Sequence, residues 1–292
     1  LTRWLPILLE QQTAEDSSDL LEYLFNKAAQ PESLTLLLHL FEHLTRPCTS
    51  LEKSMSFFGK GHRDSTPTSG KIRILGSHHW LKDALEKVLK PHMSAVAEDL
   101  VRVASANIRR AHDLGVLQGS AHREWDGLSW QRSAIELHPQ DNFDHDFDIV
   151  IDACREGLEW LLVHKRGIAR GYIKEWITSP APLLRRLAVY AMNTDRRRTP
   201  DQKLKWMVKH ELVSSTPLHH EVFLLLKNVY PLAGKEERRA FLDHARAATL
   251  MEIKANPDQD PAMYWHGLFT LLSWLDQAGD GKCPLARVKL RR

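Results

Sequence analysis

Three groups of histidines lie close enough together in the sequence to be considered as metal ligands. His39 and His43 lie four positions apart, so on a helix their imidazoles would share one face, as zinc ligands often do. The catalytic form of this spacing has a glutamate directly after the first histidine, and Leu40 takes that place here. His78-His79 and His219-His220 are adjacent pairs, whose side chains point in different directions on a helix. The spacings favour ordinary structural histidines, and no metal ligand is predicted.

An acidic cluster lies just before a helical pattern that starts at Val150. It lacks the glycine at the sixth position and the closing bidentate glutamate of a calcium loop. Carboxylates are stabilised at helix N-termini by exposed N–H groups and the helix dipole. Compensation of the helix dipole is therefore favoured over metal binding. The members of the cluster are Asp141, Asp144, His145, Asp146 and Asp148.

Motifs for nucleotide binding and nucleophilic catalysis do not fit. The stretch from Gly59 to Lys71 is rich in glycine and lysine, but Ile72 follows Gly70-Lys71 where a phosphate loop needs serine or threonine. Ser65 stands where the first glycine of that loop belongs. There is no Gly-x-Ser-x-Gly elbow, and no cysteine lies in a motif that lowers a thiol pKa. We predict no catalytic residue and no cofactor, and therefore no enzymatic activity in this chain.

Basic residues concentrate between positions 185 and 209 and could line a groove for a phosphate backbone. Trp176, Tyr190 and Trp206 are interleaved with them, and aromatic platforms often accompany nonspecific nucleic-acid binding. However, Leu183, Leu184 and Leu187 must face the core, which places the neighbouring arginines on an ordinary solvated face or at a protein contact. That second interpretation is favoured. The arginines of this basic belt are Arg185, Arg186, Arg196, Arg197 and Arg198, accompanied by Lys203 and Lys205.

Two tryptophans are candidate anchors for a protein partner. The chain has nine tryptophans, most of which should fill the space between helices. Trp125 and Trp130 differ because they lie in an irregular region, roughly from Gly115 to Asp148, and we expect both to be partly exposed. Tryptophan is enriched among the residues that dominate binding at protein interfaces.

The elements that must position these residues are helices. Apolar residues recur at helical spacing over 20–28, 34–44, 150–162 and 218–229, whereas Lys71–Leu75 is the only strand candidate. Thr199-Pro200, Thr216-Pro217 and Asp260-Pro261 each place a capping side chain before a proline, which marks a helix start, and Pro182 follows similar punctuation. The starts at 182, 200 and 217 are seventeen or eighteen residues apart, so two such helices make a unit of about 35 to 40 residues, within the range of helical-hairpin solenoids.

The predicted fold is therefore all-α, with a helical bundle followed by a helical-hairpin, solenoid-like array. We place the bundle at residues 1–145, with a mobile loop at 59–70, and the array at residues 146–292.

Composition is that of an ordinary globular protein. Of the 292 residues, 43% are hydrophobic and 26% are charged, and the net charge of +3 does not by itself indicate a nucleic-acid-binding protein. The three cysteines, Cys48, Cys154 and Cys283, lie about a hundred residues apart and suggest a reducing compartment, the cytoplasm. No apolar run is long enough for a membrane helix. Because the chain starts at Leu1 without methionine or signal-peptide layout, we expect a fragment of a longer polypeptide.

A series of helical segments carries a family resemblance. The segments are Arg132–Asp141 (RSAIELHPQD), Asp148–Arg155 (DIVIDACR), Pro182–Ala188 (PLLRRLA), Pro200–Trp206 (PDQKLKW), His220–Leu226 (HEVFLLL) and Tyr230-Pro231. Together they resemble the helical C-terminal region of large bacterial antiviral NTPases of the STAND type, particularly those with an N-terminal SIR2-like domain. The resemblance covers roughly residues 130–285 and includes no catalytic signature.

The resemblance implies a role in sensing. In that family the SIR2-like part degrades NAD, the NTPase part binds ATP and drives assembly, and the helical part senses a phage component. No motif of the first two parts occurs here, so the resemblance implies a noncatalytic sensor or scaffold that recognises a protein partner. The alternative is a helical array that binds nucleic acid through the basic belt at 185–209.

Overall fold

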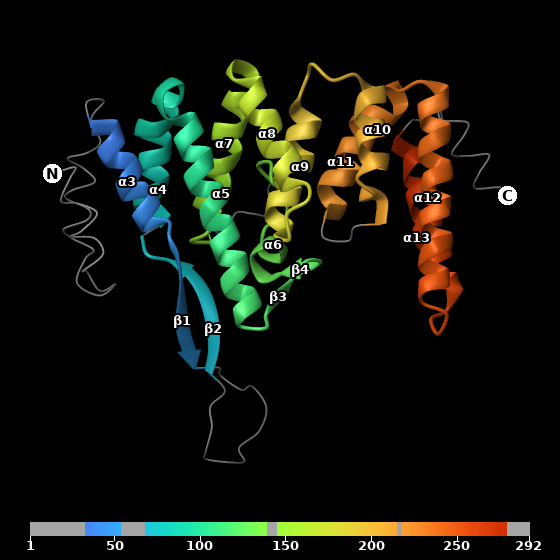
Figure 1. Cartoon of the computed structure of the whole chain (residues 1–292), viewed down its shortest axis with the longest axis horizontal. Helices are drawn as coiled ribbons and strands as arrows, with labels where there is room; N and C mark the ends of the chain where they lie inside the picture. The colour runs from blue at the N-terminus through green and yellow to red at the C-terminus, as the bar shows by residue number, and fades with distance from the viewer. Residues whose placement is uncertain (1–32, 54–67, 77, 139–144, 215–217, 279–292) are drawn as a thin grey trace, which may run out of the picture. The chain divides into compact units, whose positions relative to one another are not determined.

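The computed structural model describes residues 33–53, 68–76, 78–138, 145–214 and 218–278. Helices dominate these ranges, and their strands form two short antiparallel pairs (Figure 1), so the predicted all-α class is confirmed. The solenoid-like repeat stays a prediction. None of the helices in these ranges combines the length and the apolar character needed to cross a membrane.

The chain divides into two compact units. Unit 1 comprises residues 1–171 and 180–184, and unit 2 comprises residues 172–179 and 185–292, each within the described ranges. The division does not fall near residue 145, where the sequence suggested it. The helix that follows this position packs along a helix that precedes it, so both belong to one unit.

Unit 1 is built around that helix pair, α5 (Met93–Leu117) and α7 (Asp148–His164). Both helices bury a stripe at helical spacing, which for α7 includes Val150, Cys154 and Leu161, as the sequence predicted. Gly157 allows α7 to approach α5 closely, because a Cβ added at this position would lie only 2.7 Å from Cγ2 of Val101 on α5. The elements of unit 1 are α3 (Leu34–Leu44), β1 (Pro47–Lys53), β2 (Thr68–Ile74), α4 (His78–Ala84), η2 (Leu85–Leu89), η3 (Lys90–His92), α5 (Met93–Leu117), β3 (Ala121–His122), β4 (Trp125–Asp126), α6 (Gly127–Gln131) and α7 (Asp148–His164).

The strand pair β1–β2 is only partly anticipated by the sequence. The strand candidate at Lys71–Leu75 overlaps β2, whereas β1 carries no alternating pattern and was missed. The two strands pair from Pro47 with Ile74 to Lys53 with Thr68, across a long sequence separation. Most of the loop predicted at 59–70 lies outside the described residues, and its last three positions belong to β2.

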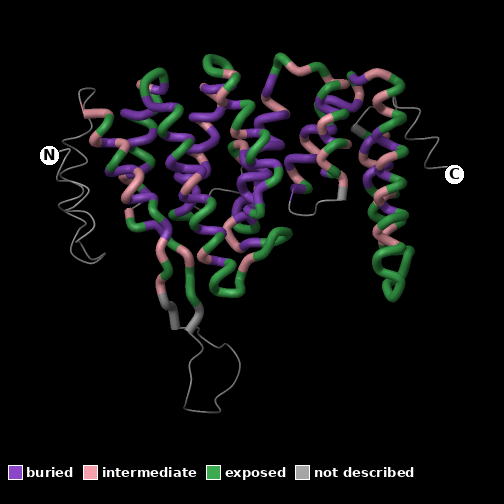
Figure 2. Tube along the Cα trace, viewed as in Figure 1, coloured by how far each residue is buried: buried purple, intermediate pink, exposed green. Residues whose placement is uncertain are grey.

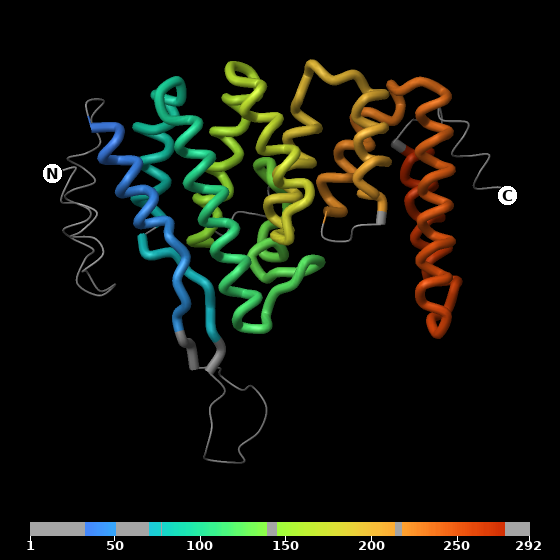
Figure 3. The backbone as a smooth tube through the Cα atoms, in the orientation of Figure 1, coloured from blue at the N-terminus to red at the C-terminus, as the bar shows by residue number. Residues whose placement is uncertain are grey.

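Unit 2 contains several short helices, followed by a pair of longer antiparallel helices at its C-terminal side. The predicted starts at Pro182, Pro200 and Pro261 are confirmed, whereas Thr216-Pro217 lies outside the described residues. Thr199 and Gln202 form a reciprocal capping box at the start of α10 (Pro200–Lys209). Figure 3 traces α12 (Lys235–Ala255) and α13 (Pro261–Ala278) as antiparallel neighbours. The elements are α8 (Arg166–Trp176) and α9 (Pro182–Thr194), which contribute residues to both units, then α10 (Pro200–Lys209), η5 (Leu212–Ser214), α11 (His219–Val229), η7 (Tyr230–Leu232), α12 (Lys235–Ala255) and α13 (Pro261–Ala278).

Candidate interaction surface

The C-terminal end of α5 turns sharply into the β3–β4 hairpin. Gly119 adopts a φ of +69°, which only glycine tolerates readily. Its N–H donates to Val116 O at 3.0 Å, and the N–H of Ser120 donates to Gly115 O at 2.9 Å. This is the Schellman pattern of a helix C-terminus. The turn folds Ala121 back onto Gly115, where an added Cβ would lie 2.8 Å from the Ala121 Cβ.

Large apolar side chains are exposed at this end of unit 1. Trp125 on β4 is half-exposed, and Trp130 on α6 is 79% exposed, as the sequence predicted for both. Val116 and Leu117 form the last turn of α5, and Leu117 is 84% exposed. The α5 end, the hairpin and α6 are therefore largely solvent-facing (Figure 2). We call these four residues the tryptophan surface.

A small cavity with a buried polar pair adjoins Trp125. It has a volume of about 200 Å³, and its wall includes Trp125, His112 and Asp126. Asp126 Oδ2 lies 3.3 Å from Nδ1 of His112, and both side chains are buried. The same carboxylate caps α6 by accepting the Ser129 N–H. In the tautomer whose Nδ1 donates to Asp126, Nε2 of His112 is a hydrogen-bond acceptor.

Among the described residues that line the cavity, Ser120 carries the one hydroxyl, and none is a cysteine. A nucleophilic triad places a hydroxyl or thiol against the second ring nitrogen of such a histidine–aspartate pair. The hydroxyl of Ser120 instead donates to Gly115 O at 3.2 Å. Burial raises the pKa of the Cys48 and Cys154 thiols, and Cys283 lies outside the described residues.

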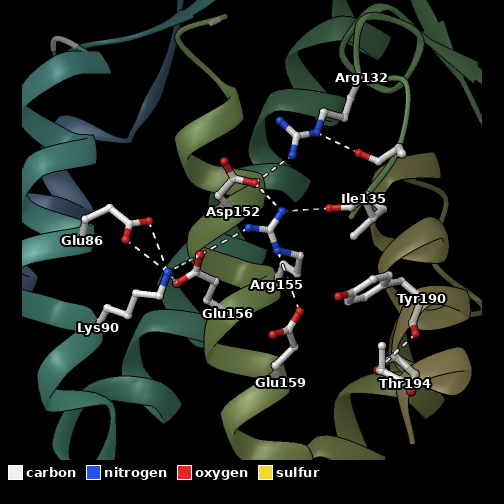
Figure 4. A network of polar contacts seen from close by, with 12 residues as sticks. Glu86, Lys90, Arg132, Ile135, Asp152, Arg155, Glu156, Glu159, Tyr190 and Thr194 are labelled. Atoms are coloured by element: carbon white, nitrogen blue, oxygen red, sulfur yellow. Dashed lines mark hydrogen bonds and ion pairs between the residues drawn. The ribbon is translucent and has the colours of Figure 1, made fainter. Parts of the chain in front are cut away.

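A second, larger cavity in unit 1 is lined by paired charges. Its volume is about 560 Å³, and Figure 4 shows the network on its wall. Arg155 donates to Asp152 at 2.7 Å and to the carbonyl of Ile135 at 2.9 Å. Arg132 donates to Asp152 and to Ala134 O, both at 2.8 Å. Since the guanidinium groups bind backbone carbonyls as well as carboxylates, the network fastens the segment around 132–135 to α7.

The acidic cluster contributes Asp148 to this network. Asp148 lies in the first turn of α7, accepts the His145 N–H at 3.1 Å and lies 3.5 Å from Arg132. Burial raises the pKa of the Asp148 carboxyl, and this effect outweighs Arg132, which lowers it. Asp141 and Asp144 lie outside the described residues. Over the described ranges, no three histidine, cysteine, aspartate or glutamate side chains are grouped to hold a metal.

The structure corrects the basic belt of unit 2. Arg185 and Arg186 are buried, so the expectation that they face solvent is wrong. Every residue of α9 from Leu183 to Met192 is buried, so this helix has no solvent face on which the two arginines could lie. Arg186 instead makes a bidentate ion pair with Glu221, at 2.8 and 2.9 Å.

The other residues of the basic belt differ in their exposure to solvent. Lys203 is buried and donates to Asn193 O at 2.7 Å. Arg198 is half-buried, and its guanidinium lies 3.6 Å from Asp195. Arg196 and Arg197 are exposed. The residues of the belt therefore do not form one continuous basic surface.

Comparisons of the chain with protein-family models, with curated proteins and with solved structures found no match.

Proposed function

We propose that this chain is a noncatalytic helical domain that binds a protein partner through the tryptophan surface. The observation that carries the proposal is the exposure of Trp125, Trp130, Val116 and Leu117 at one end of unit 1. Exposed apolar groups gathered on neighbouring elements mark interaction sites, and tryptophan contributes more than most residues to binding energy.

The cavity beside Trp125 adds a polar feature to this surface. A partner side chain that enters it would meet the buried His112–Asp126 pair beside Trp125. Protein interfaces combine an apolar core, in which tryptophan is enriched, with hydrogen bonds at about one per 100–200 Å². The partner class is therefore a protein segment that presents apolar side chains together with a polar group.

The family resemblance supplies the biological setting of the proposal. It favours a cytoplasmic sensor or scaffold within a bacterial antiphage NTPase, with a phage component as the partner. The alternative, a nucleic-acid-binding array, has less support because Arg185, Arg186 and Lys203 of its basic belt are buried.

Site-specific photo-crosslinking tests the proposal. A photoreactive amino acid replaces Leu117, which is exposed at the tryptophan surface, or Leu232, which is exposed in unit 2. Each protein is irradiated in phage-infected bacterial lysate with and without nuclease. We expect a protein adduct that forms from position 117, survives nuclease and does not form from position 232.

Matched variants test whether formation of the adduct depends on Trp125 and Trp130. Trp125→Ala with Trp130→Ala should abolish the adduct at position 117, whereas Trp265→Ala, the same change at an exposed site of unit 2, should leave it unchanged. Loss of the adduct on nuclease treatment would refute the proposal in favour of nucleic acid. An adduct equally strong in the double tryptophan variant would also refute it.

A further inference from the structure

The larger cavity of unit 1 has the dimensions of a small-molecule site. Its volume of about 560 Å³ lies within the range of roughly 300–1,000 Å³ that is usual for ligand pockets. Its wall comes from α4, η2, η3, the segment around 132–138 and the N-terminal half of α7, all within unit 1. η2 is a π-helical turn, and such turns are rare and occur frequently at functional sites. We call this space the charged cavity.

The two buried arginines of the charged cavity already have partners. Each nitrogen of the Arg132 and Arg155 guanidinium groups lies between 2.7 and 3.9 Å from a protein oxygen, and Figure 4 shows part of this network. An anion in the cavity would have to displace these oxygens, because guanidinium groups are the donors that bind carboxylate and phosphate. The inner wall is therefore poorly suited to an anionic ligand.

The carboxylates of the wall can accept further hydrogen bonds. An ionised carboxylate has about four lone-pair sites. Asp152 accepts from both arginines through Oδ1, and among the described residues its Oδ2 has no hydrogen-bond partner. Asp148 accepts the His145 N–H at 3.1 Å through Oδ2, and its Oδ1 lies 3.5 Å from Arg132. The inner wall therefore offers acceptors to a ligand.

Negative charge is in excess among the largely buried groups of the wall. There, three carboxylates face two guanidinium groups, whereas the exposed charges are two lysines and one glutamate. The electrostatics therefore favour a cation inside the cavity. The largely buried charges are Asp148, Asp152, Glu156, Arg132 and Arg155, and the exposed ones are Lys82, Glu86 and Lys90.

The Asp148 carboxylate is only partly compensated by the protein. Burial raises its pKa, and the charge of Asp152 acts in the same direction, in spite of the nearby Arg132. Asp148 and Asp152 lie four positions apart on α7, where like charges repel across one helix face. A cation placed beside them would favour the ionised carboxylates.

We propose that the charged cavity binds a small organic cation whose ammonium or guanidinium group donates to Asp148 and Asp152. Such hydrogen bonds are charge-assisted and therefore stronger than neutral ones. Simple amines and amino acids share this chemistry, and Lys82 at the mouth would favour an amino acid by attracting its carboxylate. The site is independent of the tryptophan surface, because the two cavities have no described lining residue in common.

Isothermal titration calorimetry of the full chain tests the inference with putrescine, agmatine and L-arginine. At least one of these cations should bind, whereas propionate and inorganic phosphate should not. Binding of L-arginine alone would identify an amino-acid site, and binding of all three a site for amines and guanidines. Asp148→Asn should weaken binding about tenfold or more, because it removes a charged acceptor and keeps the shape of the side chain. Asp146→Asn, at an exposed position outside the wall, should bind like the wild type.

Hydrogen exchange locates the bound cation and keeps the test independent of the variants. The cation that binds should slow amide exchange in η2 and the first turns of α7, and leave exchange in α12 unchanged. Circular dichroism should show the same helix content in the wild type and both variants. No binding of any of the three cations at millimolar concentration would overturn the inference. So would equal affinity in Asp148→Asn, protection confined to other elements, or binding of the two anions in place of the cations.

Discussion

The ion pair between Arg186 and Glu221 should be a structural requirement of unit 2. Both side chains are buried, with 4% and 1% of their surface exposed, and two hydrogen bonds of 2.8 and 2.9 Å join them. Arg186→Met leaves the Glu221 carboxylate buried without its main counter-ion. Breaking a buried pair in this way costs about 3–5 kcal/mol, and Glu221→Leu should cost a similar amount.

The double variant distinguishes a buried pair from two independent contacts. Replacing both partners by apolar residues of similar volume is often nearly neutral, because neither charge has to be desolvated. We therefore expect Arg186→Met with Glu221→Leu to lose about 0–2 kcal/mol, far less than the two single losses together. Arg196→Met with Arg197→Met, at exposed positions, should change stability by less than about 0.5 kcal/mol.

Urea unfolding followed by circular dichroism measures these free energies. Hydrogen exchange of the α9 and α11 amides assigns the loss to unit 2. Single variants that lose less than about 1 kcal/mol would refute the reasoning, since the desolvation penalty would then be absent. A double variant that loses the sum of both single losses would refute it as well. Confirmation would also show that Arg186 variants report folding, so nucleic-acid binding should be tested at Arg196 and Arg197.

Two further predictions concern packing and pH. Gly157→Ala should destabilise the protein by about 1–3 kcal/mol, because its Cβ would lie 2.7 Å from Val101 in the α5–α7 contact. Gly171→Ala in α8, where a Cβ meets nothing within 4 Å, should instead stabilise it by up to about 1 kcal/mol, and equal effects in thermal unfolding would contradict both expectations. Burial raises the pKa of Asp148, so the native state binds more protons than the unfolded state, and this residue's contribution to stability grows as the pH falls. Relative to Asp148→Asn, the wild type should gain stability from neutral to mildly acidic pH in urea titrations, and a constant difference would contradict this.

Several elements could be predicted from the sequence because their signals are local. The apolar spacing from Val150 to Leu162 predicted α7, and Thr199-Pro200 predicted the capped start of α10. The exposure of Trp125 and Trp130 was predicted from their place in a stretch without helical apolar spacing, although the structure puts them on β4 and α6. In each case the physical cause, a helical period, a capping oxygen or a break in the pattern, lies within a few residues of the chain.

Other features have no local signal. β1 forms through hydrogen bonds to a strand about twenty residues away, and its own residues do not alternate. His112 and Asp126 are fourteen positions apart and meet through the turn at Gly119, so no spacing motif marks them. The stretch from Leu250 to Thr270 carries apolar residues as a core segment does, yet none of its residues is buried, because the neighbouring α10 and α11 are shorter than α12 and α13.

The amino-acid sequence by itself determined the helical class, the starts of α9, α10 and α13, and the exposure of the two tryptophans of the candidate surface. Helical periodicity and caps act between near neighbours, so the order of residues is enough to define them. Only the tertiary structure decided that Arg185 and Arg186 are buried, because burial depends on what surrounds a helix on every side. A helical pattern assigns an arginine beside a leucine stripe to solvent, but α9 is covered at each position from 183 to 192, and the arginines must then be stabilised by partners such as Glu221.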